Sequence, residues 1–519
     1  SPLLFNLVID ELLDILDSMG SNGCAFRSGP KCRALAFADD IVLVGEDSKD
    51  VDKLLRATST FFERRGMVLH PDKCRALVLA RSSGRNIYPV TRPGLQIDGK
   101  ALSTVTDVNP MQYLGYGFDT HGVTKPNLTN YSAWLQRLTA LPLRPHQKIA
   151  LLRIHLLPRL LHFLMSPRTP TATLKNIDKV TRHYVKRMVH LHLHTSDALI
   201  HAPLKDGGLG IMEVAVSIPT ILLRRISNLK TRNGSDEVLG AVLTTDRVSN
   251  LVAKQEERVR KFPPNYHQQE IAKGAFSRGL EKAKEDPSSR TWITDCAKGW
   301  TGMDWVRAVH LRTANLPTVG IITNPVELRG CRAGCKANET ICHILQACPA
   351  SHDSRVARHN AIASKIASHC RKKGWSTLEE PQVRHQDGTL FKPDVVTFTA
   401  PDRETAEPMG AIWDRKRQVY DNTKFREAAS RKWPGVAFSF MPCIIGAPGI
   451  WPGCNKPLEE ALNIRPPFKR GCISSVLKWG CSAHRSFMKR VWKRRDQKRF
   501  RTGNTDGTPP LPDTQASET

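Results

Sequence analysis

The sequence is poor in acidic residues and has no long apolar run. Its 519 residues hold 49 Asp and Glu against 77 Lys and Arg, so the formal net charge is +28. No segment approaches the roughly 20 apolar residues that a membrane-spanning helix needs, and no lipidation signal is present. We therefore expect no membrane partner. A cationic surplus of this size predicts a polyanionic partner instead, and nucleic acid is the default choice.

The sequence also lacks the pattern of a disulfide framework. Its 13 cysteines are odd in number, and four metal-ligand residues group at the spacing C-x3-C-x7-H-x4-C, which favours a reducing compartment. The four are Cys331, Cys335, His343 and Cys348. Three thiolates and one imidazole form a closed tetrahedral set, typical of structural zinc. Cys342 adjoins His343 and is an alternative third ligand.

Four later cysteines fit no standard metal-binding spacing, and we expect them to be core residues or free thiols. They are Cys443, Cys454, Cys472 and Cys481.

Two adjacent carboxylates, Asp39 and Asp40, separate two short apolar runs that are rich in β-forming residues. This pattern predicts a tight hairpin with the aspartates at its tip. Adjacent acids repel each other, and a divalent cation that prefers hard oxygen ligands, such as Mg²⁺, would neutralise them. A solvated turn is the alternative, and a bare Asp-Asp pair would favour it. The motifs around the pair favour a metal site over a solvated turn.

Phe37-Ala38-Asp39-Asp40 resembles the aromatic-x-Asp-Asp box of a reverse transcriptase palm. Residues 1–6, 66–74 and 113–115 resemble other palm boxes in the order of that family, and non-LTR retrotransposon polymerases are the most similar group. The resemblance implies that Asp39, assisted by Asp40, binds Mg²⁺ that aligns a primer 3′-hydroxyl and stabilises the departing pyrophosphate. Lys73 would orient or protonate the departing phosphates.

The family's other metal-binding palm aspartate would precede Ser1. From this we expect a fragment with an incomplete polymerase site that does not extend primers on its own.

Apolar periodicity predicts helices at 1–20 and 49–66, with short strands at 67–69 and 76–79. From 133 to about 210 the chain reads as mainly helical. Within it, residues 178–190 predict either a thumb helix along the template–primer backbone or a solvated helix face. The cations there are Lys179, Arg182, Lys186 and Arg187. A Gly-rich turn at 207–210 is weak evidence of phosphate binding.

A second carboxylate set, Asp394 and Asp414, resembles the Pro-Asp … Asp-x-Lys pattern of restriction-like nucleases. The two acids would hold one divalent ion, Mg²⁺, and Lys416 would position or activate the attacking water. In that family the lysine often lies in the following helix, so Lys424 and Lys432 are alternatives, with Tyr420 nearby. We expect a basic run after the cysteine cluster to contact DNA phosphates. It includes Arg355, Arg358 and His359.

The predicted fold is an α+β multidomain chain. Its parts are a partial reverse transcriptase palm (1–125), a helical thumb (126–215), a helical linker region (216–325), a CCHC zinc knuckle with its basic run (326–365), an α/β restriction-like endonuclease (366–485), and a basic segment with a disordered tail (486–519). Residues 489–501 interleave cations with aromatics and predict a nucleic-acid contact or a nuclear-import signal.

The resemblance implies an RNA-directed DNA polymerase with a DNA-nicking endonuclease, from a site-specific non-LTR retrotransposon that inserts into ribosomal RNA genes. The expected partners are a DNA target, the element RNA and deoxynucleoside triphosphates, and the expected location is the nucleus. Mg²⁺ would serve both catalytic sites and Zn²⁺ would be structural. The alternatives are a catalytically dead nucleic-acid-binding remnant and a maturase-like enzyme of group II introns. No His-Asn-His nuclease motif supports the second.

Overall fold

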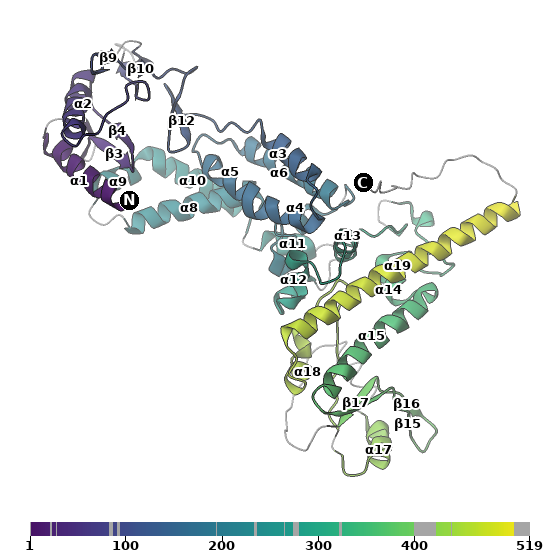
Figure 1. Cartoon of the computed structure of the whole chain (residues 1–519). Coiled ribbons are helices and arrows are strands. Elements are labelled where there is room, and N and C mark those ends of the chain that lie inside the picture. The colour runs from purple at the N-terminus through teal and green to yellow at the C-terminus, as the bar shows by residue number, and fades with distance from the viewer. Residues whose placement is uncertain are drawn as a thin grey trace. The chain divides into compact units, whose positions relative to one another are not determined.

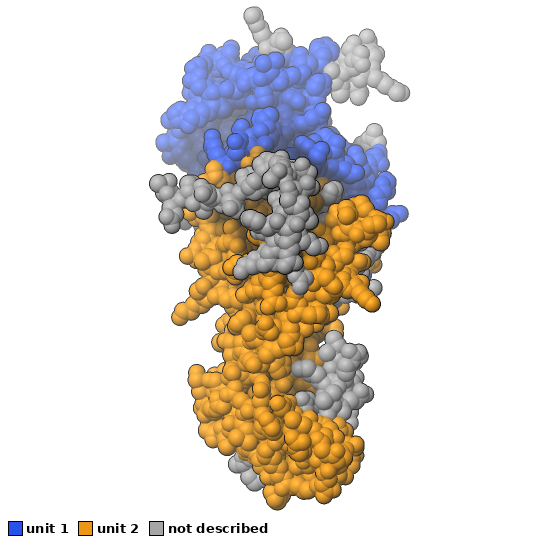
Figure 2. Space-filling model, turned by 90° about the vertical axis from the view of Figure 1, so that its right-hand side faces the viewer, with its two compact units in different colours: residues 1–138, 152–181, 212–265 blue, residues 139–151, 182–211, 266–519 orange. Residues whose placement is uncertain are grey.

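A computed structural model (Figure 1) describes residues 2–20, 23–26, 29–81, 87–90, 94–193, 195–232, 236–263, 265–272, 280–320, 324–398, 422–436 and 438–502. The chain divides into two compact units (Figure 2). Unit 1 comprises residues 1–138, 152–181 and 212–265, and unit 2 comprises residues 139–151, 182–211 and 266–519.

Unit 1 begins with two helices that pack beside the predicted hairpin. Helices α1 (Pro2–Ser18) and α2 (Ser48–Glu63) flank strands β3 (Ala34–Phe37) and β4 (Asp40–Leu43). Their shared core is apolar and contains Ile9, Leu12, Leu16, Leu54, Phe61 and Phe62. Asp47 caps α2 by accepting a hydrogen bond from the backbone N–H of Asp50. These helices and strands are the ones predicted from apolar periodicity.

The predicted strand at 67–69 is wrong. The backbone N–H of Met67 donates to the carbonyl of Phe62 at 2.9 Å, so the chain is still closing the end of α2 there. Met67 and Leu69 pack against the core between α1 and α2. Their apolar character therefore reflects packing, and neither residue belongs to a sheet.

The other strands of unit 1 are short and form small separate sheets. They are β1 (Cys24–Ala25), β2 (Lys31–Cys32), β5 (Arg75–Ala76), β6 (Leu79–Arg81), β7 (Ile87–Pro89), β8 (Gln96–Ile97), β9 (Lys100–Ala101), β10 (Ser103–Thr104), β11 (Met111–Tyr113), β12 (Tyr116–Asp119) and β13 (Gly122–Val123). The predicted strand at 76–79 is thus split between β5, which pairs in parallel with β10, and β6, which pairs with β7. Strands β11, β12 and β13 form one three-stranded antiparallel sheet.

The middle of the chain is mainly helical, as predicted. Its elements are α3 (Tyr131–Ala140), α4 (Pro145–Leu151), a π-helical turn (Leu152–Leu156), α5 (Leu157–Leu164), α6 (Thr171–Met188), α7 (Asp197–His201), α8 (Val214–Arg232), α9 (Glu237–Leu243), α10 (Asp246–Arg260) and α11 (Tyr266–Ala272). In unit 1 the buried carboxylate of Asp178 accepts hydrogen bonds from the backbone N–H groups of Val214 and Ala215, at the start of α8.

The Gly-rich turn at 207–210 packs inside unit 2. Gly207 has a φ of +89°, and a side chain at Gly208 would approach the carbonyl oxygen of Ala202 to within 2.3 Å. Gly207, Gly208 and Leu209 are all buried. The glycines therefore permit a close backbone approach, and this geometry does not support phosphate binding.

Unit 2 is organised around one long helix, α19 (Pro466–Thr502), which packs against α12 (Ser288–Asp295), α13 (Gly302–Arg312), α14 (Ile341–Gln346) and α15 (His352–Arg371). The predicted domain boundary at 485/486 falls inside α19. Three tryptophans of the predicted linker region, Trp292, Trp300 and Trp305, are buried in this unit, so that region contributes to the core of unit 2.

Two small antiparallel sheets complete unit 2. Strand β14 (Ser376–Glu379) pairs with β17 (Val395–Phe398), and β15 (Val383–Arg384) pairs with β16 (Leu390–Phe391). Helices α17 (Thr423–Lys432) and α18 (Lys456–Ala461) follow. Among the described residues, no helix is both long enough and apolar enough to span a lipid bilayer.

Candidate active sites and metal centre

The hairpin β3–β4 presents Asp39 and Asp40 at its tip. Phe37 pairs with Asp40 across the turn, and Ala38 has a φ of +53°. That conformation is unusual for a residue with a side chain and is typical of a sharp two-residue hairpin turn. Both aspartates are exposed, so their carboxylates are accessible to a cation and to substrate.

The hairpin tip lies near strand β11. Burial raises the pKa of the Tyr113 hydroxyl, and the negative charge of Asp40 raises it further. Tyr113 begins residues 113–115, another segment that resembles a palm box, so the charge of one predicted box acts on the other. Lys73 is exposed in a turn whose preceding residue, Asp72, pairs with Lys100 at 2.6 Å. Within the described residues, Asp39 and Asp40 have no third carboxylate, imidazole or thiol close enough to complete a metal site.

Cys331, Cys335, His343 and Cys348 form the one group of potential metal ligands in the described part of the chain. Their ligand atoms all lie within 4.8 Å of one another. The Cys348 sulfur is 3.9 Å from that of Cys331 and 3.7 Å from that of Cys335. Zinc–sulfur bonds of about 2.3 Å in a tetrahedral arrangement hold sulfurs about 3.8 Å apart. The donor set therefore fits zinc in both its chemistry and its spacing.

The buried Nε2 atom of His343 has no hydrogen-bond partner, which is the state expected of an imidazole nitrogen reserved for a metal ion. His343 lies in α14, where the Thr340 hydroxyl accepts a hydrogen bond from its backbone N–H. Cys342, the alternative ligand, is exposed and outside the group. Cys472 and Cys481 are buried on α19, and burial raises the pKa of each thiol to about 12.

Helix α19 closes the hydrophobic core behind this group. Phe487 and Val491 of α19 are buried against Cys331, Ile344 and Cys348. The ligands therefore belong to a packed layer, and a metal ion bound there would also stabilise the position of α19.

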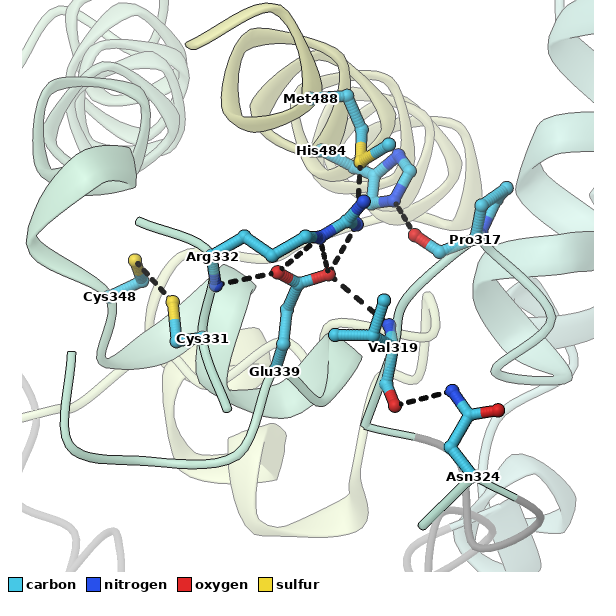
Figure 3. A network of polar contacts seen from close by, with 9 residues as sticks. All are labelled: Pro317, Val319, Asn324, Cys331, Arg332, Glu339, Cys348, His484 and Met488. Atoms are coloured by element: carbon cyan, nitrogen blue, oxygen red, sulfur yellow. Dashed lines mark hydrogen bonds and ion pairs between the residues drawn. The ribbon is translucent and has the colours of Figure 1, made fainter. Parts of the chain in front are cut away.

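A buried carboxylate, Glu339, connects backbone segments around the cysteine–histidine group, whose residues 331–348 are called the knuckle below (Figure 3). Its side chain is fully buried and accepts hydrogen bonds from the backbone N–H groups of Val319 and Arg332 and from the Arg332 guanidinium. The Arg332 guanidinium also reaches the Met488 sulfur at 3.5 Å, and His484 Nε2 lies 2.8 Å from the Pro317 carbonyl oxygen. The sequence prediction missed Glu339, whose only signal is its place between Cys335 and His343.

The basic run after the knuckle lies at the start of α15. Arg355 donates to the Cys348 carbonyl at 2.7 Å, and Arg358 donates to the Leu345 carbonyl at 3.4 Å. Burial lowers the pKa of Arg358. Both guanidiniums thus bind the end of α14 and the knuckle backbone. Contact of this run with DNA stays a prediction.

His359, also on α15, lies beside the candidate nuclease carboxylate. Its Nε2 atom is 3.0 Å from an Asp394 carboxylate oxygen. Asp394 immediately precedes β17, and its carbonyl accepts a hydrogen bond from the backbone N–H of Glu380 at 3.0 Å. Two motifs that are separate in the sequence, the basic run and the Pro-Asp pair, therefore meet in unit 2.

Asp414, Lys416 and Tyr420 lie outside the described residues, so their predicted roles stay predictions. Of the alternative lysines, Lys424 pairs with Asp387 at 2.7 Å, and Lys432 donates to the carbonyl of Gln382. The carboxylate of the same Asp387 also lies 2.8 Å from Nδ1 of His385, the residue that directly follows β15.

The predicted thumb cations divide into two kinds. Arg182 and Lys186 both pair with Asp197 at 3.0 Å, whereas Lys179 and Arg187 are exposed. Only the second pair displays its full charge to solvent.

The aspartate hairpin and strand β11 lie within a reverse transcriptase domain, which a family comparison identifies. Residues 1–118 match the family described as reverse transcriptase (RNA-dependent DNA polymerase). Over 95% of its length the chain is 40% identical to a "Retrovirus-related Pol polyprotein from type-1 retrotransposable element R2" of Popillia japonica, and it covers 83% of that relative.

A second such protein of Popillia japonica is 41% identical, with 95% of this chain and 70% of the relative covered. The polyprotein of the type-2 element R2DM of Drosophila melanogaster is 31% identical over 94% of this chain and 48% of its own length. The chain belongs to the family of R2 non-LTR retrotransposon Pol polyproteins. The predicted reverse transcriptase identity is confirmed.

Proposed function

We propose that this reverse transcriptase acts in target-primed reverse transcription, with a DNA-nicking site in unit 2 that supplies the primer. The observation that carries this proposal is the contact of His359 with Asp394 at 3.0 Å. It joins the helix that follows the knuckle to the carboxylate of the residue that precedes β17. The nuclease would nick chromosomal DNA in a ribosomal RNA gene, and the freed 3′-hydroxyl would prime copying of the element RNA into DNA in the nucleus.

In the nuclease site, Asp394 and Asp414 would hold one divalent ion, and His359 would hold the Asp394 carboxylate in place. Bound Mg²⁺ supplies charge stabilisation of the phosphate and a more acidic water. Lys416, or Lys424 or Lys432 in its place, would orient the attacking water. Attack of the water oxygen on phosphorus would break the bond to the 3′-oxygen. A proton from the water would end on that oxygen as the 3′-hydroxyl, and the phosphate would stay on the 5′ end.

In the palm, Asp39 and Asp40 would hold Mg²⁺, and Lys73 would orient or protonate the departing pyrophosphate. Their exposure at the tip of a strained hairpin supports this role. Because no third ligand lies within reach among the described residues, we expect residues 1–519 alone not to extend primers.

The CCHC group would hold a structural zinc ion. Its four protein ligands leave no position for a reacting water, so it would supply stability and no catalytic step.

The test is Mg²⁺-dependent nicking of supercoiled plasmid that carries ribosomal DNA. Asp394→Asn and Asp414→Asn should each abolish nicking, since each removes a metal ligand. The matched control is Asp353→Asn, because Asp353 is an exposed aspartate on α15 in the same unit, 3.6 Å from Arg490. Nicking by the wild type that survives in both variants would overturn the assignment. A wild type that binds zinc and never nicks would favour a nucleic-acid-binding remnant.

A further inference from the structure

A cavity of about 310 Å³ lies on α19 beside α13, within unit 2, and is lined in part by Trp300, Asp304, Lys478, Trp479 and Arg485. We call this cavity, together with the exposed face of α19 that follows it, the groove. The indole N–H of Trp300 donates to the Ser474 hydroxyl at 2.8 Å, which fixes this wall of the groove to α19. None of these residues belongs to the candidate palm, knuckle or nuclease sites.

One face of α19 extends this lining along the helix. Lys478, Arg485, Lys489 and Trp492 are exposed. Their spacings of seven, four and three residues place them on one side of a helix. The opposite side packs inward, with Phe487 and Val491 buried against the knuckle. Trp492 is 59% exposed, so a large aromatic surface faces solvent beside a row of cations.

The charges around the cavity are mostly positive. Arg307 of α13 adds a cation, and Asp304 is the one acidic residue among those that line the cavity. Burial would raise the pKa of Asp304, but hydrogen bonds from Thr301 and the charges of Lys478 and Arg307 lower it overall. Its carboxylate is engaged in capping α13 through Thr301. The groove therefore attracts an anion.

We propose that this groove binds a single strand of nucleic acid. The phosphates would follow Lys478, Arg485 and Lys489, and unpaired bases would stack against Trp479 and Trp492. Lys478 and Lys489 are separated by roughly 16 Å along the helix axis, enough for several phosphates of one strand. Aromatic faces beside a cationic track favour single strands, because the bases of a duplex are already stacked on each other. The inference rests on the proposed function only in taking nucleic acid as the partner.

The test measures fluorescence anisotropy of a labelled unstructured 20-nucleotide RNA, the DNA of the same sequence, and its duplex, without Mg²⁺. The variant Lys478→Gln/Arg485→Gln/Lys489→Gln should bind both single strands at least tenfold more weakly. Its salt dependence should also be less steep by about 2, because each single-strand phosphate contact contributes roughly 0.7 to the slope. Trp492→Ala should weaken binding roughly tenfold and leave that slope unchanged.

The matched control neutralises three exposed cations elsewhere in unit 2 and should bind within about twofold of the wild type. These are Lys372→Gln, Lys456→Gln and Arg465→Gln. Circular dichroism and zinc content confirm that each variant is folded. Equal loss in the groove variant and the control would overturn the proposal, as would wild-type binding to duplex that matches or exceeds binding to single strands. Because no catalysis occurs without Mg²⁺, failure to nick DNA would leave this result unaffected.

Discussion

Replacing Glu339 with glutamine should loosen the knuckle without changing its shape. The fully buried carboxylate accepts hydrogen bonds from the backbone N–H groups of Val319 and Arg332 and from the Arg332 guanidinium. Glutamine of the same length keeps one acceptor oxygen, turns an amide NH₂ toward the donors, and leaves the Arg332 charge without its partner.

Removing one partner of a buried ion pair costs about 3–5 kcal/mol. The Arg332 side chain is 33% exposed, so water recovers part of its charge and we discount the cost to about 2–3 kcal/mol. That free energy corresponds to a roughly 30- to 150-fold increase in the population of the locally opened state.

Hydrogen exchange followed by mass spectrometry on the full chain measures this opening directly. Amides of residues 329–348 should exchange roughly 30- to 150-fold faster in Glu339→Gln, while those of α1 and α2 should not change. Glu327→Gln is the control, because Glu327 is an exposed glutamate in the same region. Unchanged exchange across 329–348 would refute the view that this carboxylate holds the loop.

Further predictions concern the metal, the nuclease and the response to pH. Cys348→Ser should reduce bound zinc, measured by plasma mass spectrometry, from about one equivalent to none. Cys342→Ser should retain the zinc. Zinc lost from Cys342→Ser and retained by Cys348→Ser would make Cys342 the ligand in place of Cys348. His359→Gln should lower nicking roughly 10- to 100-fold, as loss of a residue that orients a metal ligand does; full activity would exclude that role. Burial lowers the pKa of His201 to about 4 from 6.5, so the unfolded chain binds more protons between these values. Stability should fall by up to about 3 kcal/mol as the pH drops from 6.5 to 4. Urea unfolding of His201→Gln should show a smaller fall, and an equal fall would contradict this.

The local features were predictable from the sequence because each is encoded within a few turns of chain. The helices α1 and α2 follow from apolar periodicity, and the hairpin follows from two β-forming runs around Asp39 and Asp40. The metal-ligand group from Cys331 to Cys348 was predicted from its spacing for the same reason. Its four donors lie close together in the sequence, so a short loop can bring them around one ion.

The long-range features were not predictable in the same way. The contact of His359 with Asp394 and the burial of Glu339 both depend on packing between distant segments. Helix α19 continues through the expected boundary at 485/486 because Phe487 and Val491 pack on the knuckle. The amino-acid composition shows only that the segment becomes more basic there, so it does not predict this packing. The apolar residues at 67–69 resembled a strand, although Met67 and Leu69 pack against the core between α1 and α2.

The central claim is that one chain carries two separate carboxylate sites for divalent ions. Fe²⁺ can replace Mg²⁺ at oxygen ligands, and with ascorbate and peroxide it cleaves the nearby backbone. The account predicts two groups of cuts, one near Asp39–Asp40 and one near Asp394, both suppressed by excess Mg²⁺. Asp39→Asn should remove only the first group and Asp394→Asn only the second. Cuts at other positions, or cuts that Mg²⁺ does not suppress, would contradict the account.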